Sequence, residues 1–141
     1  MTRQTSFETT MVVNFGDTDP AAIVYFPNIF HYCQIAFERF LPEAAQITYA
    51  RMLADERIAF PTVEAKASFR KAIRYGESVR IRVEIGHLGD SSVQWLYEGF
   101  NVEGDSYFKV SLTTVCLSMD TFKSQTLPDK YRQTFSQYLI A

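Results

Sequence analysis

Two carboxylates separated by a single residue, Asp17 and Asp19, are the residues whose types and spacing point most directly to chemistry. A carboxylate can attack a carbonyl carbon as a nucleophile, or it can activate water as a general base. Both lie just ahead of Pro20, and Asp and Pro are also ordinary residues of a turn between a strand and a helix. Taken alone, the pair favours a turn over a catalytic site.

The predicted helix that follows this loop strengthens the catalytic interpretation. From Pro27 to Leu41 the few polar residues are spaced by three and four in a mainly apolar stretch, as in a nearly buried helix. Pro27 suits the first helical position, and Pro42 is expected to end the helix sharply. Unpaired N–H groups and the helix dipole favour negative charge at such an N-terminus. An oxyanion formed on an attacked carbonyl group would therefore be stabilised there, beside a carboxylate.

Other catalytic centres have weaker support. The six glycines form neither a phosphate-binding loop nor the nucleophile elbow of a serine hydrolase. The tripeptide Gly-Asp-Ser occurs at 89–91 and again at 104–106, where turns between strands account for both copies. Four residues that could ligate a metal share no recognisable spacing, and they are His31, Cys33, His87 and Cys116. We therefore expect no metal site.

The elements that must position the loop fall into two parts of the chain, which differ in the spacing of their apolar residues. After the helix, apolar residues alternate with polar ones, which is typical of strands with one buried face. Strands are predicted at 7–15, 63–70, 79–85, 93–102 and 107–117, and short helices at 49–56 and 128–139. The last three strands are expected to form an antiparallel meander, and the sheet is expected to curl around the apolar helix. The sequence thus predicts an α+β fold in a single domain over residues 1–141.

Composition narrows the possible partners. With 16 acidic against 14 basic residues, the net charge of −2 gives no general attraction to nucleic acid or to a membrane surface. No apolar stretch approaches the length that spans a bilayer, so no membrane partner is expected. The two cysteines and the absence of a signal peptide pattern indicate a cytoplasmic, reduced protein. Twelve Phe and eight Tyr predict an aromatic core, pocket or interface.

Residues 15–28, Phe-Gly-Asp-Thr-Asp-Pro-Ala-Ala-Ile-Val-Tyr-Phe-Pro-Asn, resemble the signature of 4-hydroxybenzoyl-CoA thioesterase-like hotdog proteins. The resemblance implies a hotdog fold, in which a long antiparallel sheet wraps a central helix. It implies a homodimer or homotetramer that hydrolyses an acyl-CoA substrate without a metal or bound cofactor. Asp19 matches the family's catalytic Asp, as nucleophile or general base. The backbone N–H of Phe26 matches the group that polarises the thioester carbonyl, and Asp17 becomes the turn residue.

The sequence departs from this family at positions that bear on the substrate. Ala22 stands where glycine is common, Ile29 where an aromatic residue is common, and Phe26 where related short-chain thioesterases often carry His. Tyr25 and Phe26 are therefore expected to line a pocket for an aromatic acyl group such as hydroxybenzoyl, with core packing as the alternative role for either ring. A short-chain acyl-CoA or acyl-carrier-protein thioesterase is an alternative function. A non-catalytic acyl-CoA-binding hotdog protein is another.

The phosphates of CoA require cations on a protein with net negative charge. Arg70, Lys71 and Arg74 lie together where one predicted strand ends, and we expect them to bind the nucleotide end of CoA. An ordinary solvated strand end is the alternative explanation of these charges. A hotdog dehydratase or hydratase, which pairs a carboxylate with a catalytic His, fits less well because neither His31 nor His87 is placed for that pairing.

Overall fold

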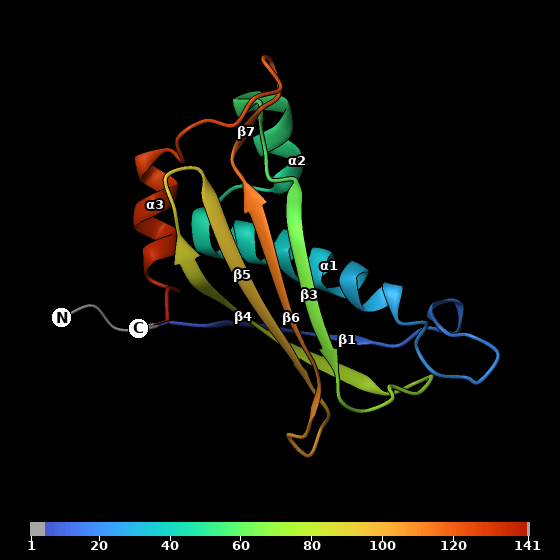
Figure 1. Ribbon diagram of the computed structural model, residues 1–141. Coiled ribbons are helices and arrows are strands. Elements are labelled where there is room, and N and C mark those ends of the chain that lie inside the picture. Colours follow the sequence, from blue (N-terminus) through green and yellow to red (C-terminus); the bar gives the residue numbers. More distant parts are fainter. Residues whose placement is uncertain (1–4, 141) are drawn as a thin grey trace.

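The computed structural model describes residues 5–140, and it has an antiparallel sheet curled around one long helix (Figure 1). The five-stranded sheet has the order β1-β4-β5-β6-β3, in which β4, β5 and β6 form the predicted meander. The predicted hotdog arrangement is confirmed. The helices are α1 (Pro27–Ala45), α2 (Tyr49–Arg51), which continues into a π-helical turn (Met52–Glu56), and α3 (Asp129–Ser136). The strands are β1 (Phe7–Val12), β2 (Ile58–Ala59), β3 (Thr62–Phe69), β4 (Ser78–Leu88), β5 (Ser92–Phe100), β6 (Ser106–Val115) and β7 (Leu117–Ser118).

An aromatic core holds α1 against the sheet, as the composition predicted. The Phe40 ring is fully buried and lies 5.3 Å from Trp95 and 4.8 Å from Tyr138, measured between ring centroids. Trp95 projects from β5 and donates its indole N–H to Thr114 at 3.0 Å, so the one polar atom of this large side chain is satisfied. Burial of these rings fixes the helix on the concave face of the sheet and thereby fixes the position of its N-terminus.

The prediction that Pro42 ends α1 is wrong, because the helix continues to Ala45. Pro42 removes one backbone hydrogen bond from the helix, because proline has no N–H. Pro42 is exposed, but Leu41 before it is fully buried, and this burial outweighs the lost bond. Ala44 and Ala45 also pack against the core, which favours one further turn. The helix ends at Gln46, which adopts a left-handed φ of 56° and donates its N–H to the Pro42 carbonyl.

The prediction that β3 has one buried face is also wrong, because every residue of β3 is exposed. The α1 helix packs on β1 and β4, whereas β3 forms the opposite edge of the sheet. Among residues 5–140, nothing covers the apolar residues of β3, and Val63 is 62% and Phe69 47% exposed. One edge of β3 pairs with β6, and its other edge has no strand partner among residues 5–140.

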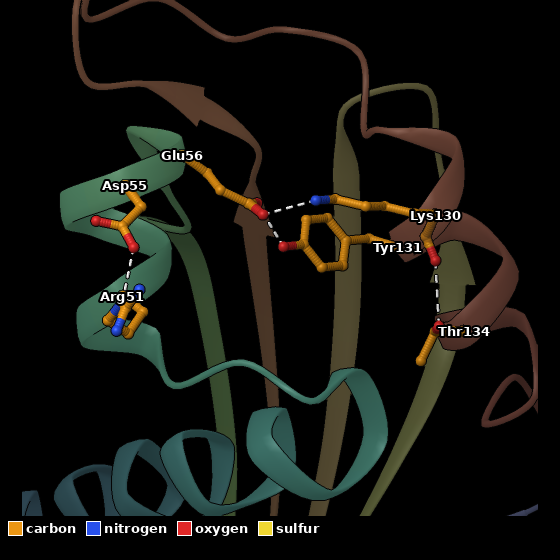
Figure 2. Close-up of polar contacts among 6 residues, drawn as sticks. All are labelled: Arg51, Asp55, Glu56, Lys130, Tyr131 and Thr134. Atoms are coloured by element: carbon orange, nitrogen blue, oxygen red, sulfur yellow. Dashed lines mark hydrogen bonds and ion pairs between the residues drawn. The ribbon is translucent and has the colours of Figure 1, made fainter.

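A polar clasp joins the π-helical turn after α2 to α3, beyond the C-terminal end of α1 (Figures 1 and 2). The Glu56 carboxylate accepts hydrogen bonds from the buried Tyr131 hydroxyl and from Lys130 Nζ, the latter at 2.6 Å. Burial raises the pKa of Glu56, but these two donors outweigh burial and leave the pKa below its ordinary value. Burial and the bond to Glu56 raise the pKa of the Tyr131 hydroxyl, so Tyr131 stays a donor at neutral pH.

Candidate active site

Asp19 lies in a tight loop between β1 and α1. Its N–H donates to the Ile23 carbonyl and its carbonyl accepts from the Ala22 N–H, both at 2.9 Å. Its side chain is half-buried, and Oδ1 accepts the Ala21 N–H at 2.9 Å. Within residues 5–140, Oδ2 accepts no hydrogen bond. The loop thus anchors one carboxylate oxygen of Asp19 and leaves the other available.

The backbone after β3 supports this loop from the side. The Val24 N–H donates to the Ile73 carbonyl at 2.8 Å, and the Tyr75 N–H donates to the Ala22 carbonyl at 3.1 Å. Ile23 and Arg74 form an isolated antiparallel bridge between the two segments. The structure therefore brings the predicted CoA-binding segment beside the loop that carries Asp19.

Asp17 connects the loop to the helix. The Tyr32 hydroxyl and the Asn14 N–H both donate to Asp17 Oδ2, at 2.8 and 3.1 Å. The Asp17 carbonyl accepts the Asn28 side-chain amide at 2.8 Å and the Tyr25 N–H at 3.0 Å. Burial, followed by the bond to Asp17, raises the pKa of Tyr32 well above its usual range, so the phenol remains a donor. Asp17 is therefore a turn residue that joins four other residues.

The N-terminus of α1 has one backbone donor directed away from the helix. Pro27, the first helical residue, has no N–H, and the N–H groups of Asn28 and Ile29 donate to the carbonyls of Tyr25 and Phe26. The Phe26 N–H has no acceptor within the described part of the chain. Helix N-termini favour negative charge, so a carbonyl oxygen that gains charge would be stabilised by this group.

A groove of about 520 Å³ runs along this N-terminus. Phe26 lies in its wall, with ring centroids 5.8 Å from Phe69 and 5.7 Å from Tyr25. Phe26 and Tyr25 are both more than half exposed, so core packing, the alternative for these rings, does not account for them. The lining residues are Ile23, Val24, Phe26, Ile29, Phe69, Arg70, Lys71 and Ala72.

The groove brings some of the predicted site residues together and leaves others outside it. Phe26, Arg70 and Lys71 line it, whereas Asp19, Tyr25 and Arg74 do not. Phe69 was missed by the sequence analysis, although its place at the end of an alternating strand, next to Arg70, was a usable signal.

The three predicted cations differ in their surroundings. The N–H groups of Arg70 and Lys71 both donate to the Tyr107 carbonyl, which holds this strand end against β6. Lys71 Nζ lies 3.4 Å from the Asp105 carboxylate, an exposed pair that screening by solvent weakens. Among the described residues, no acid pairs with the guanidinium of Arg70 or Arg74. These two arginines are the better candidates for an anionic ligand.

Ala22 carries strain at the turn of the loop, because its φ is 62°. The left-handed region costs a residue with a Cβ roughly 1–2 kcal/mol, which accounts for glycine being common at this place in the family. We expect Ala22→Gly to stabilise the protein by about 1 kcal/mol and to raise Tm by roughly 3 °C in thermal unfolding. Ala21→Gly is the control, since Ala21 has no positive φ. An equal rise in both variants would contradict the strain at Ala22.

Two further properties of the described residues concern ligands and membranes. Across residues 5–140, no three His, Cys, Asp or Glu side chains gather in a way that could hold a metal ion. In the same range, no helix has the length and apolar character needed to cross a membrane.

Comparison with known proteins extends the likeness to nearly the whole chain. A model of the thioesterase-like superfamily matches residues 13–135. A 1,4-dihydroxy-2-naphthoyl-CoA hydrolase of Nostoc punctiforme is 30% identical over 128 residues, which cover 91% of this chain and 85% of that protein.

Solved structures agree in fold. A 1,4-dihydroxy-2-naphthoyl-CoA thioesterase from Synechocystis matches with a TM-score of 0.84 and 21% identity over 94% of this chain and 96% of its own. A gentisyl-coenzyme A thioesterase matches with a TM-score of 0.80 and 28% identity over 92% of this chain and 99% of its own. The chain therefore belongs to the thioesterase-like superfamily and is a thioester hydrolase with the hotdog fold.

Proposed function

We propose that this protein hydrolyses an acyl-CoA thioester with an aromatic acyl group, with Asp19 as its catalytic carboxylate. The observation that carries the proposal is that one short loop holds a carboxylate oxygen and a helix N–H that are both without partners among the described residues. Hydrolysis of a thioester needs these two functions, a nucleophile or base and a donor for the carbonyl oxygen. No metal or bound cofactor is required for either.

The chemistry follows from these two groups. The thioester carbonyl would place its oxygen on the Phe26 N–H, which stabilises the negative charge that develops there. Asp19 then either attacks the carbonyl carbon, giving an anhydride that water hydrolyses, or removes a proton from a water molecule that attacks. In both routes the C–S bond breaks, CoA leaves as the thiolate, and the acid is released.

The rings beside this position favour an aromatic acyl group. Phe26 and Phe69 face the groove as an edge-to-face pair, and a ring-shaped acyl group can pack against them. The names of the relatives agree with this, because both the naphthoyl and the gentisyl group contain a ring. Arg70 and Arg74 would then bind phosphates of CoA, with Lys71 as a third cation.

The free edge of β3 supports a homodimer. An exposed edge strand offers unpaired N–H and C=O groups to another strand, and this one also exposes Val63, Ala65, Ala67 and Phe69. Pairing of β3 with β3 of a second copy would continue the sheet and cover these side chains. Because Phe69 lines the groove, the second copy would also border the site. Two such dimers would make the predicted homotetramer.

A substrate panel tests the acyl group. Thiol release should be measured with benzoyl, hydroxybenzoyl, phenylacetyl, naphthoyl and straight-chain CoA thioesters, and with acyl-carrier-protein thioesters. We expect kcat/KM for a hydroxylated ring substrate to exceed that for straight chains by about 10-fold or more. A preference for straight chains would overturn the aromatic acyl group. Failure to hydrolyse any of them would overturn the acyl-CoA substrate.

The same assay tests the nucleotide end of CoA. In a variant with Arg70→Glu and Arg74→Glu, we expect KM for acyl-CoA to rise by about 10-fold, because each substitution replaces a phosphate-binding cation by a repelling charge. The matching N-acetylcysteamine thioester lacks phosphates, so its KM should not change. An unchanged KM for acyl-CoA would remove these arginines from the site.

A further inference from the structure

Two backbone hydrogen bonds of Tyr25 fix the chain at the peptide group that carries the Phe26 N–H. The Tyr25 carbonyl accepts the Asn28 N–H at 2.8 Å, and the Tyr25 N–H donates to the Asp17 carbonyl at 3.0 Å. In a planar trans peptide the carbonyl and the following N–H point in opposite directions. Because the Tyr25 carbonyl is fixed toward the helix, the Phe26 N–H must point away from it.

Asp17 is in turn held by Tyr32, which lies on the second turn of α1. The Tyr32 side chain is 3% exposed, and its hydroxyl donates to Asp17 Oδ2 at 2.8 Å. This bond joins a buried donor on α1 to the side chain of Asp17, the residue whose backbone carbonyl accepts the Tyr25 N–H. Asp17 is also two residues from Asp19, so the same bond limits how the loop that carries Asp19 can shift relative to the helix.

We propose that Tyr32 is a positioning residue for thioester hydrolysis, which acts through Asp17 to orient the Phe26 N–H and the Asp19 carboxylate. The inference rests on the proposed roles of those two groups. A misplacement of about 1 Å can reduce a rate by about 100-fold, so a bond that touches no substrate can still control turnover.

A purely structural role for Tyr32 is the competing explanation, and the fold supplies a matched control. Tyr131 is also 3% exposed and also donates its hydroxyl to a carboxylate, that of Glu56 (Figure 2). Glu56 lies beyond the C-terminal end of α1, a helix of 19 residues that spans about 28 Å. Tyr32→Phe and Tyr131→Phe therefore remove the same kind of bond, one near the loop and one far from it.

The experiment compares both variants with wild type in steady-state hydrolysis of an active acyl-CoA and in thermal unfolding. We expect both to lower Tm to a similar extent. Tyr32→Phe should lower kcat by about 10-fold to 100-fold and change KM by less than about threefold, while Tyr131→Phe keeps kcat within about twofold. Equal kcat values in the two variants would overturn the proposal.

Variants of Asp17 test the same proposal if Tyr32→Phe does not fold. Both hydrogen bonds to the Asp17 side chain reach Oδ2, so the amide oxygen of Asp17→Asn can accept them and Asp17→Ala cannot. We expect Asp17→Asn to keep most of kcat and Asp17→Ala to lose it as Tyr32→Phe does. Equal kcat in the two Asp17 variants would also overturn the proposal.

A double variant separates this inference from the proposed role of Asp19. Residues that act as one unit have strongly non-additive effects, so Tyr32→Phe should have little further effect on kcat in an Asp19→Asn background. Full additivity would show that Tyr32 acts independently of Asp19 and would overturn that part of the proposal. If Asp19→Asn alone keeps wild-type activity, the role of Asp19 fails by itself, and the kcat of Tyr32→Phe still decides whether Tyr32 orients the Phe26 N–H.

Discussion

Asp19→Asn is expected to lower kcat by about 10³-fold or more, because the amide can neither attack a thioester carbonyl nor take a proton from water. The loop should keep its shape, since Oδ1 of the asparagine can still accept the Ala21 N–H that Asp19 accepts at 2.9 Å. KM should change far less than kcat, because the lost interaction operates in the transition state. Thiol release under saturating substrate measures the effect.

Asp55→Asn is the control for removal of a carboxylate. Asp55 is exposed on the π-helical turn and pairs with Arg51 at 2.6 Å, far along the chain from the loop. Its kcat should equal that of wild type, and unfolding midpoints should be alike for both variants. A kcat for Asp19→Asn within threefold of wild type would remove Asp19 from the mechanism and direct attention to water bound at the Phe26 N–H.

The residues of this loop show which parts of a site can be predicted from sequence. The types and spacing of Asp17, Asp19 and Pro20 indicated a turn ahead of a helix, and the structure places them so. The partner of Asp17 was not predictable, because the sequence places Tyr32 simply among the apolar residues of a buried helix. Its hydroxyl acquires a role from the angle at which the loop meets the helix, which is a tertiary property.

The two wrong structural predictions have a shared cause. The pattern of apolar and polar residues along the sequence does not show which of them other parts of the fold will bury. Alternation in β3 correctly indicated which side chains share a face, but not whether anything in the same chain covers that face. Pro42 carried a local stop signal, and burial of the neighbouring Leu41 outweighed it. In each case the packing of α1 decided the outcome, and its contacts are long-range in sequence.

Ala65→Glu is expected to convert the proposed dimer to a monomer and to abolish most activity with it. Ala65 lies near the middle of β3, so a two-fold pairing of β3 with β3 would bring two added carboxylates close together. Like charges across strands are destabilising, and an edge strand with a charge resists pairing. The isolated chain should still fold, because Ala65 is exposed in it and no buried contact is lost.

Sedimentation or light scattering should then find a species near the chain mass of 16.2 kDa where wild type has twice that mass or more. Val102→Glu is the matched control, since Val102 is 82% exposed in the turn after β5 and lies off the β3 edge. That variant should keep both the assembly and kcat. A wild-type protein that is monomeric and fully active would show that the groove beside Phe69 needs no second copy. An Ala65→Glu dimer with unchanged kcat would place the interface elsewhere, since two buried carboxylates at this edge could not both stay ionised without a large loss of affinity.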